Sequence, residues 1–260
     1  MKCPGGLSCA VERRWPGLME QLPTIPEAGA SLLRTIVVAL FVLTFIVEPF
    51  LIPSGSMEPT LLVGDFLLAN RQVFAPSGPL GRLILPYGKV QRGDIVVFYH
   101  PKPALLVKRV VGVPGDRLRL VHGHVWINGK PVYEPYARFR PSVPDAYRDN
   151  FPWKVYADPE INPDWWRQMR RLTHNGQLTI PAGEYFVLGD NRNHSDDSRF
   201  WGFVPRRAIL AKPLVIYFSL NETASKGRRE GANDRLTKKQ GFVANLTGFA
   251  RWNRIFRVVH

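Results

Sequence analysis

Three short stretches of this 260-residue chain hold side chains whose types and spacing could carry out chemistry. The first, residues 53–60, reads Pro-Ser-Gly-Ser-Met-Glu-Pro-Thr. A serine that is flanked by glycine and followed by proline is typical of a tight turn, where backbone N–H groups can face an oxyanion and a hydroxyl can project outward. Ser54 and Ser56 are therefore candidate reactive residues, although the same stretch would also suit a plain linker.

The second stretch, residues 105–112, contains a lysine inside a β-branched run. If the segment is a strand, Lys108 shares a face with Leu106 and Val110. Should that face point inward, loss of solvation lowers the pKa of the amine, and a fall from about 10.4 to about 8 is within the range that burial produces. A neutral lysine can act as a base. The competing interpretation is an edge-strand lysine that discourages aggregation.

The third stretch, residues 189–199, is rich in polar and turn-forming residues and follows an apolar run at 185–188. The aromatic residues directly after it, at 200–205, must pack, and a loop held between packed segments usually positions something. Asp197 and Arg199 are suitably spaced for a local ion pair, and Ser195 could hydrogen bond a neighbouring amine. A solvated loop is the simpler alternative.

The elements that must position these stretches are short β-branched or aromatic runs separated by turn residues, among them the hairpin signal Asn128-Gly129. The pattern predicts a mainly β body with an antiparallel sheet. The expected strands are 66–69, 94–99, 106–112, 118–121, 124–127, 177–180, 185–188 and 209–218. Residues 133–175, rich in proline and aromatic residues, break the pattern and are expected to form an inserted subdomain.

One segment is apolar enough for a lipid bilayer. Residues 35–47 carry no charge, and the extended segment 32–52 would span about 31 Å as a helix. We expect 32–52 to be one uncleaved transmembrane helix, because no small-x-small site follows it; a buried core helix is the alternative. The positive-inside rule places residues 1–31 in the cytoplasm and everything after the helix, residues 53–260, outside.

The charge and cysteine content limit the kinds of partner and metal site that this chain could have. The formal net charge is +14, and the only cysteines, Cys3 and Cys9, exclude a disulfide framework or a cysteine-based zinc site further along. The C-terminal segment 226–260 carries a local net charge of +7, which favours anionic phospholipid headgroups; no motif for nucleic acid occurs. A membrane-anchored basic binding protein is therefore the non-enzyme alternative.

The sequence also offers residues for two other kinds of site. His194 with Asp190, Asp196 or Asp197 could complete a Ser-His-Asp triad with Ser56, although no Gly-x-Ser-x-Gly motif accompanies it. A Ser-x-x-Lys arrangement is excluded because position 59 is proline. His122 and His124 lack a third ligand at metal spacing, so we expect surface residues rather than zinc ligands, with no metal and no cofactor.

Taken together, four blocks of this sequence resemble type I signal peptidase, a membrane-anchored Ser-Lys endopeptidase of bacteria. The blocks are residues 48–70, 92–98, 108–116 and 189–205, in that order after the apolar segment. The resemblance implies that Ser56 is the nucleophile and Lys108 the general base. It also implies that the Ser54 side chain and the Ser56 N–H form the oxyanion hole, that Ser195 orients the lysine, and that Asp197 and Arg199 form a structural ion pair.

The resemblance further implies that the substrates are secretory preproteins, cut after small residues at the first and third positions before the bond. It places the enzyme in the bacterial inner membrane with its catalytic domain on the periplasmic or extracytoplasmic side. The matching substrate-binding positions are Phe50, Ile52, Pro53, Met57, Leu67, Val97 and Val107. The chain departs from the family at Asn193-His194, where Asp-Asn is frequent. Residues 1–31 contain no apolar run able to span a membrane, so we expect a single anchor where many members have a further upstream helix, and the insertion has no cysteine pair.

Because Ser56 lies four residues beyond Ile52, we also expect cleavage at the outer membrane surface. Trp153, Trp165 and Trp166 of the insertion are candidates for the membrane interface. The alternative is that these tryptophans fill a small core of the insertion.

Overall fold

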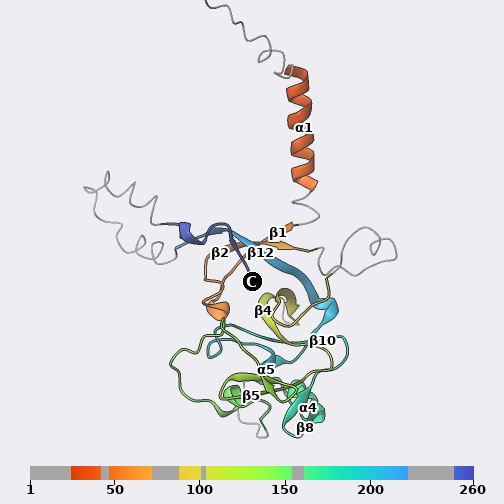
Figure 1. The fold of residues 1–260 in the computed structure, drawn as a ribbon, viewed down its shortest axis with the longest axis vertical. Coiled ribbons are helices and arrows are strands. Elements are labelled where there is room, and N and C mark those ends of the chain that lie inside the picture. Colours follow the sequence, from red (N-terminus) through yellow and green to blue (C-terminus); the bar gives the residue numbers. More distant parts are fainter. Residues whose placement is uncertain (1–24, 42–46, 72–87, 101–103, 154–160, 222–248) are drawn as a thin grey trace, which may run out of the picture. The chain divides into compact units, whose positions relative to one another are not determined.

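The computed structural model describes residues 25–41, 47–71, 88–100, 104–153, 161–221 and 249–260. The chain divides into two compact units, Met1–Thr44 and Phe45–His260. Figure 1 labels the main elements. Ser56, Lys108 and Ser195 all belong to the second unit, so the site can be described within that unit alone.

The first unit contributes one helix, α1, at Ile25–Phe41. The apolar side chains in its second half are exposed by 45–63%. Among the described residues, no helix combines the length and the apolar character needed to cross a bilayer.

The expected continuous helix over 32–52 is wrong at its C-terminal end. Residues Val47–Leu51 form strand β1, which pairs antiparallel with strand β2 at Asp65–Asn70. Pro49 explains the difference, since proline has no N–H to donate within a helix and disfavours helical backbone in the residue before it. Hydropathy could not reveal this, because an apolar strand and an apolar helix have the same composition.

A large antiparallel sheet forms the frame of the second unit. Its strand order is β1-β2-β12-β3-β4-β10-β11, with β13 paired to β12. The remaining strands are β3 at Ile95–His100, β4 at Ala104–Gly112, β10 at Glu184–Leu188, β11 at Val204–Pro205, β12 at Ile209–Ser219 and β13 at Arg257–Val258. Phe50 of β1 and Val107 of β4 pack against the same core although they lie far apart in the sequence. The three chemical stretches follow β1, lie on β4 and follow β10.

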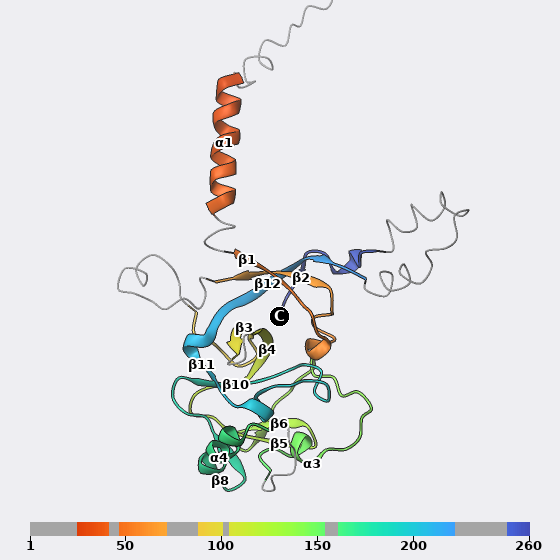
Figure 2. The same ribbon diagram turned by 180° about the vertical axis from the view of Figure 1, so that it is seen from behind.

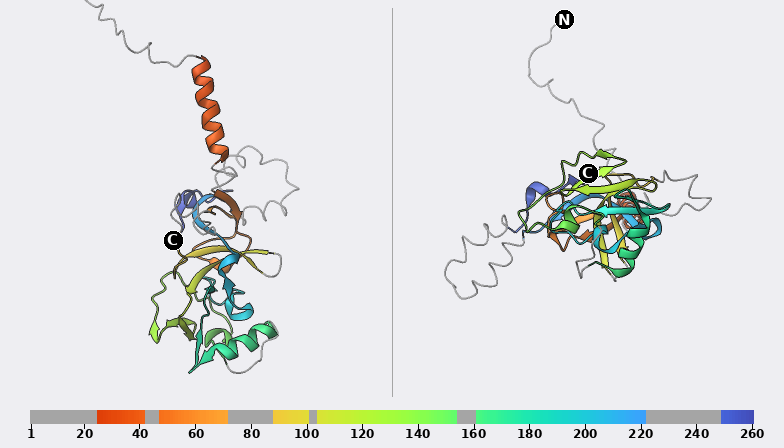
Figure 3. Two further views of the ribbon diagram at one scale, coloured as in Figure 1. Left: turned by 90° about the vertical axis from the view of Figure 1, so that its right-hand side faces the viewer. Right: turned by 90° about the horizontal axis from the view of Figure 1, so that it is seen from below.

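A second antiparallel sheet has the order β7-β6-β5-β9-β8. It lies at the end of the unit remote from β12, with the short helices beside it (Figures 2 and 3). Its elements are β5 at Arg117–Val121, β6 at His124–Ile127, β7 at Lys130–Pro131, α3 at Ala146–Asp149, α4 at Pro163–Leu172, β8 at Thr173–His174 and β9 at Gln177–Thr179. The mainly β, antiparallel fold class is therefore confirmed.

The second sheet is larger than the insertion expected from sequence. It runs from Arg117 to Thr179, whereas the expectation was 133–175. The reason is that β5 and β6 alternate like the strands of the large sheet, and only the pairing of β5 with β9, through Arg117 with Thr179 and Leu118 with Leu178, assigns them to the second one. Local pattern does not specify the partner of a strand.

The tryptophans of the insertion divide between core and surface. Trp165 and Trp166 on α4 are buried in a core with Tyr147 and Phe151, while Trp153 is partly exposed. Trp165 also donates its indole N–H to the carbonyl of Arg199. The expectation that Trp165 and Trp166 lie in a membrane interface is therefore wrong: the face of α4 that carries them packs against the sheet.

Candidate active site

Ser56 lies on a single 3-10 turn, Gly55–Met57, which follows β1 directly. Met57 is buried in a core with Ile52 and Leu61, and its carbonyl accepts the Leu61 N–H at 3.0 Å. Because the buried Met57 side chain anchors the turn in the core, the turn is held in place while Ser56 remains half-buried. Its Oγ is 3.5 Å from Ser54 Oγ.

Lys108 extends from the middle of β4, opposite Val96 on β3. It shares the face expected from sequence with Val110, and only 3% of the lysine is exposed. Its Nζ donates to Ser195 Oγ at 3.1 Å. Burial lowers the pKa of Lys108 from its usual 10.5 to about 8, against the opposing charges of Asp197 and Asp196.

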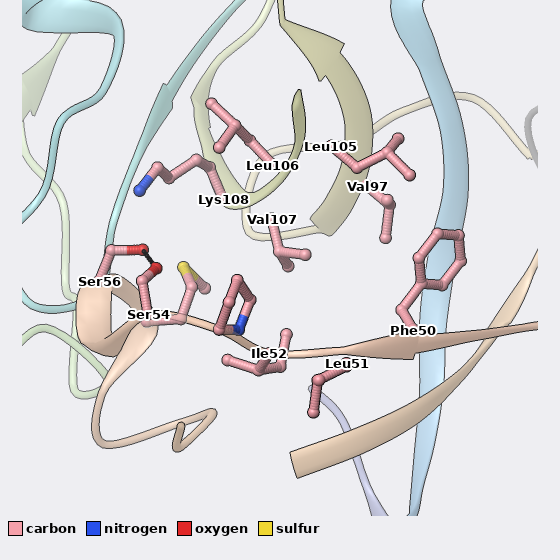
Figure 4. A pocket seen from close by; sticks show the side chains of 12 residues that line it. Phe50, Leu51, Ile52, Ser54, Ser56, Val97, Leu105, Leu106, Val107 and Lys108 are labelled. Carbon is pink, nitrogen blue, oxygen red and sulfur yellow. Dashed lines mark hydrogen bonds between the residues drawn. The ribbon is translucent and has the colours of Figure 1, made fainter. Parts of the chain in front are cut away.

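Lys108 and Ser56 line the same cavity, and the lysine nitrogen points toward Ser56 in Figure 4. Side chains from three strands complete the wall of this cavity of about 60 Å³. The lining residues are Phe50, Leu51, Ile52, Pro53, Ser54, Ser56, Met57, Val97, Leu105, Leu106, Val107 and Lys108. A small apolar hollow therefore lies next to a hydroxyl and an amine whose pKa is near neutrality.

Six of the seven expected substrate-binding positions lie on this wall. Leu67 does not: it is fully buried and packs in the core with Ile52 and Met57, behind the wall. Leu51, Leu105 and Leu106 line the cavity without having been singled out from the sequence. Leu51 lies in the apolar segment that hydropathy predicts as helix, and Leu105 and Leu106 precede Lys108 in an apolar run, so nothing in the sequence marks these side chains individually.

Ser195 is held from both sides. Its hydroxyl accepts from Lys108 and hydrogen bonds the carboxylate of Asp197. Asp197 in turn accepts from Nε and Nη2 of Arg199, each at 2.8 Å. Burial alone would raise the pKa of Asp197, but the charge and hydrogen bonds of Arg199 hold it below its usual value. The expected ion pair exists, and through Ser195 it reaches the amine of Lys108.

Gly189 provides the close approach between the polar loop and the serine turn. A Cβ built on Gly189 would lie 2.3 Å from Ser195 Oγ and 2.4 Å from the Ser56 carbonyl oxygen. Real Cβ atoms do not come this close to their neighbours, so only glycine fits without displacing one of the two serines.

Two further buried ion pairs were not predicted from the sequence. Arg109, next to Lys108, donates twice to Asp190 at 2.8 Å, and Asp190 also accepts from the Thr60 hydroxyl. Arg192 donates twice to Glu134. The adjacency of Arg109 to Lys108 was the available clue to the first pair, whereas Glu134 is 58 residues from Arg192 and no local pattern connects them.

The histidines do not lie in this arrangement. His194 is exposed, and two of its proposed acidic partners, Asp190 and Asp197, are bound by arginines. His122 and His124 are both exposed, as expected, and His124 packs against Phe139. The described residues contain no group of three or more side chains suited to a metal ion.

The sequence of this chain is similar to those of known peptidases. A sequence model of the family "Signal peptidase, peptidase S26" matches residues 25–218. Signal peptidase I of Pseudomonas aeruginosa is 37% identical over 224 residues, covering 78% of this chain and 77% of that protein. Signal peptidase I of Haemophilus influenzae is 31% identical, covering 80% and 74%.

A crystal structure of a signal peptidase I from Enterococcus faecalis V583 is 31% identical, covers 48% of this chain and 96% of that one, and has a TM-score of 0.35. The matched range includes Ser56, Lys108 and Ser195. The chain therefore belongs to the signal peptidase family S26, whose members are serine peptidases that remove signal peptides.

Proposed function

We propose that this chain cleaves preproteins with a Ser-Lys dyad in which Ser56 is the nucleophile and Lys108 is the general base. The observation that carries the proposal is the burial of Lys108 beside Ser56, which lowers the pKa of its amine to about 8. Near neutral pH a useful fraction of the amine is then unprotonated and can accept the Ser56 proton.

The hydrogen bond to Ser195 orients the lone pair of the neutral Lys108 amine. A neutral amine has one lone pair, and donating one N–H to Ser195 leaves that lone pair to face the cavity where Ser56 lies. Ser56 then attacks the scissile carbonyl, and Lys108 passes the proton to the leaving amine. The acyl-enzyme is hydrolysed by a water that the same amine deprotonates.

The oxyanion hole in this proposal consists of the Ser56 N–H and the Ser54 hydroxyl. Ser54 Oγ lies 3.5 Å from Ser56 Oγ, close enough to reach an oxygen bound to the attacked carbon. Preorganised donors of this kind stabilise the charge that develops in the transition state. Asp197 and Arg199 do not react; they hold Ser195 in place.

The cavity wall supports a substrate class with small side chains. A hollow of about 60 Å³, lined by Phe50, Val97 and Val107 among others, has room for alanine-sized groups rather than large ones. We propose secretory preproteins with small residues at the first and third positions before the cut. In this proposal the serine turn provides the wall for the first position and the β1 end provides it for the third.

We further propose that α1 anchors the chain in the bacterial inner membrane, with a single pass and the catalytic unit on the periplasmic or extracytoplasmic side. The exposed apolar residues of α1, which include Leu33, Val37 and Leu40, support this, since lipid would cover them. Membrane phospholipids are then a partner. Val37→Glu should shift the protein from the pellet to the supernatant when membranes are extracted with carbonate.

The basic segment 226–260 contributes less free charge than its sequence suggests. Residues 222–248 lie outside the described part. Within the rest, Arg254 is buried and donates to Asp65, and Arg251 donates to Ser219. These two arginines tie the C-terminal residues to the large sheet, so lipid attraction would have to come from other residues of the segment.

The test is cleavage of a preprotein with an Ala-x-Ala site by the purified full chain in detergent, followed by sequencing of the new amino terminus. We expect the cut directly after the second alanine. Lys108→Ala should abolish turnover because it removes the proposed base. Lys108→Arg should abolish it because a guanidinium does not deprotonate at usable pH. His194→Ala serves as the matched control and should retain most activity, since His194 is exposed.

The opposite pattern would overturn the proposed mechanism. An inactive His194→Ala together with an active Lys108→Ala would indicate a Ser-His-Asp enzyme, whatever bond it cuts. A parent protein that leaves the Ala-x-Ala preprotein intact would contradict the substrate class.

A further inference from the structure

Asn191 makes two contacts with the serine turn. It lies in the loop that follows β10 and is 2% exposed. Its backbone N–H donates to the Ser56 carbonyl at 3.0 Å, and its side-chain Nδ2 donates to the Gly55 carbonyl at 3.0 Å. One residue thus holds two consecutive peptide carbonyls of the turn.

The contact with Gly55 sets the direction of the Ser56 N–H. A carbonyl oxygen only accepts, so the side-chain nitrogen of Asn191 must be the atom that faces Gly55. The C=O of Gly55 and the N–H of Ser56 belong to the same planar trans peptide, in which they point in opposite directions. Fixing the Gly55 carbonyl on the Asn191 side therefore points the Ser56 N–H away from Asn191.

Asn191 is itself held firmly by its neighbours. On one side Asp190 is bound by Arg109, and its carbonyl accepts the Arg138 N–H at 2.7 Å. On the other side Arg192 donates its own N–H to Arg138 at 2.9 Å. The backbone on both sides of Asn191 is therefore held in place where Asn191 contacts the serine turn.

Stability does not account for the asparagine at this place. Its Oδ1 is buried and has no hydrogen-bond donor among the residues that the structure describes. A buried acceptor without a donor is unfavourable, and an apolar side chain of similar volume would avoid it. The Nδ2 bond to Gly55 is the contact that remains to explain the residue.

We propose that Asn191 is a positioning residue of the oxyanion hole: it orients the Gly55–Ser56 peptide so that the Ser56 N–H is directed at the oxyanion. This inference rests on the proposed role of that N–H. Asn191 does not touch the substrate, and its effect is on the transition state, where the oxyanion exists, rather than on substrate binding.

The test uses Asn191→Leu, which keeps the number and branching of side-chain heavy atoms but removes the donor, and Asn191→Asp, which turns an oxygen toward the Gly55 carbonyl. Steady-state kinetics are measured with the full chain and the Ala-x-Ala preprotein. We expect kcat to fall roughly 10- to 100-fold in both variants, somewhat less than the loss of a direct oxyanion donor, with KM changed by less than about 2-fold. The melting temperature of Asn191→Leu should fall by no more than a few degrees, because the lost Nδ2 bond to Gly55 is partly offset by removal of the buried Oδ1 that has no donor.

Two further readouts separate positioning from a general loss of structure. The pH midpoint of the rate should stay where the parent has it, because Lys108 is untouched. The effects of Asn191→Leu and Ser54→Ala on kcat should be less than multiplicative, since both act on the same oxyanion.

Asn193→Leu is the matched control. Asn193 lies in the same loop, but its Nδ2 donates to the Arg140 carbonyl and to Ser142 rather than to the serine turn. Its kcat should stay within about 2-fold of the parent.

Either of two results would overturn the inference. An Asn191→Leu enzyme with unchanged kcat would show that the N–H is oriented without it, while an active parent would leave the proposed function intact. A collapsed melting temperature in Asn191→Leu would show that the residue holds the fold. Failure of the proposed function gives a different result, namely a parent that does not cleave or a Ser56→Ala variant that does.

Discussion

The two sides of Ser56 differ in polarity: one is mainly apolar and the other is rich in charged and polar side chains. On one side, strands β1, β3 and β4 present an apolar wall around a small cavity. On the other, the loop at 189–199 and the segment at 134–140 bring together ion pairs and hydrogen bonds. The apolar wall is defined by shape, and the polar side is defined by directional bonds.

The polar side is unusual in how completely it is buried. Arg109–Asp190, Arg192–Glu134 and Arg199–Asp197 all have side chains exposed by 4% or less. Buried ion pairs of this kind contribute little net stability. Removing one partner is nevertheless costly, because it leaves the other charge buried without compensation. The comparison therefore indicates that changes on the polar side should be severe and changes on the apolar wall should be graded.

The largest effect should come from breaking the Arg199–Asp197 pair. Asp197→Ala leaves the Arg199 guanidinium buried without its carboxylate and removes the acceptor for Ser195 and the Gly189 N–H. We expect a loss of about 3–5 kcal/mol in the free energy of unfolding. Chemical denaturation of parent and variant measures it.

The control for this prediction is an exposed pair on the same unit. Asp164 and Arg167 on α4 have side chains exposed by 86% and 67%. Arg167→Ala should change the free energy of unfolding by less than about 1 kcal/mol. Equal losses in the two variants would remove the distinction between buried and exposed pairs.

The next effect concerns the close approach at Gly189. In Gly189→Ala the new Cβ would overlap both Ser195 Oγ and the Ser56 carbonyl, so one of the serines must move. We expect kcat to fall by roughly 100-fold or more, since small displacements of reacting groups are costly. Gly29→Ala, where a Cβ meets nothing within 4 Å, is the control and should keep full activity.

The pH dependence of the rate follows from the lowered pKa of Lys108. Only the neutral amine accepts a proton, so kcat/KM should rise with pH and level off above about 8. Below that value it should fall about tenfold for each pH unit, because the neutral fraction of the amine falls tenfold. Initial rates from pH 5 to 10 test this. A midpoint near 6.5 that disappears in His194→Ala would assign the ionisation to histidine instead.

The smallest effect should come from the apolar wall. Val107→Ala removes two methyl groups beside the cavity and should let a preprotein with valine in place of the last alanine be cut up to about 10-fold faster. Cleavage of the alanine substrate should change by less than about 3-fold. A loss as large as that of Gly189→Ala would show that the wall is as exacting as the polar side.

Much of this molecule could be predicted locally. All eight expected strands are confirmed to within about two residues, because alternating β-branched runs carry their own signature. The face of Lys108 also followed from period-2 alternation, and its burial is confirmed. The hairpin at Asn128-Gly129 has positive φ at both residues, as its sequence requires.

Other features depended on partners that lie far away in the sequence. The apolar run at β1 predicts a helix because its pairing with β2 has no local signature, and only the contact with β9 assigns β5 and β6 to the second sheet. The pairing of Arg192 with Glu134 and the contacts of Asn191 with the serine turn are of the same kind.

The sequence by itself determined the residue types, the strand periodicity and the order of the four family blocks, because each is a property of neighbouring residues. Only the tertiary structure decided which strands pair, that Leu67 lies behind the wall and not on it, and that Ser195 lies within hydrogen-bonding distance of Lys108. The physical reason is that local backbone preference acts over a few residues, whereas burial and ion pairing depend on segments that the fold brings together from across the chain.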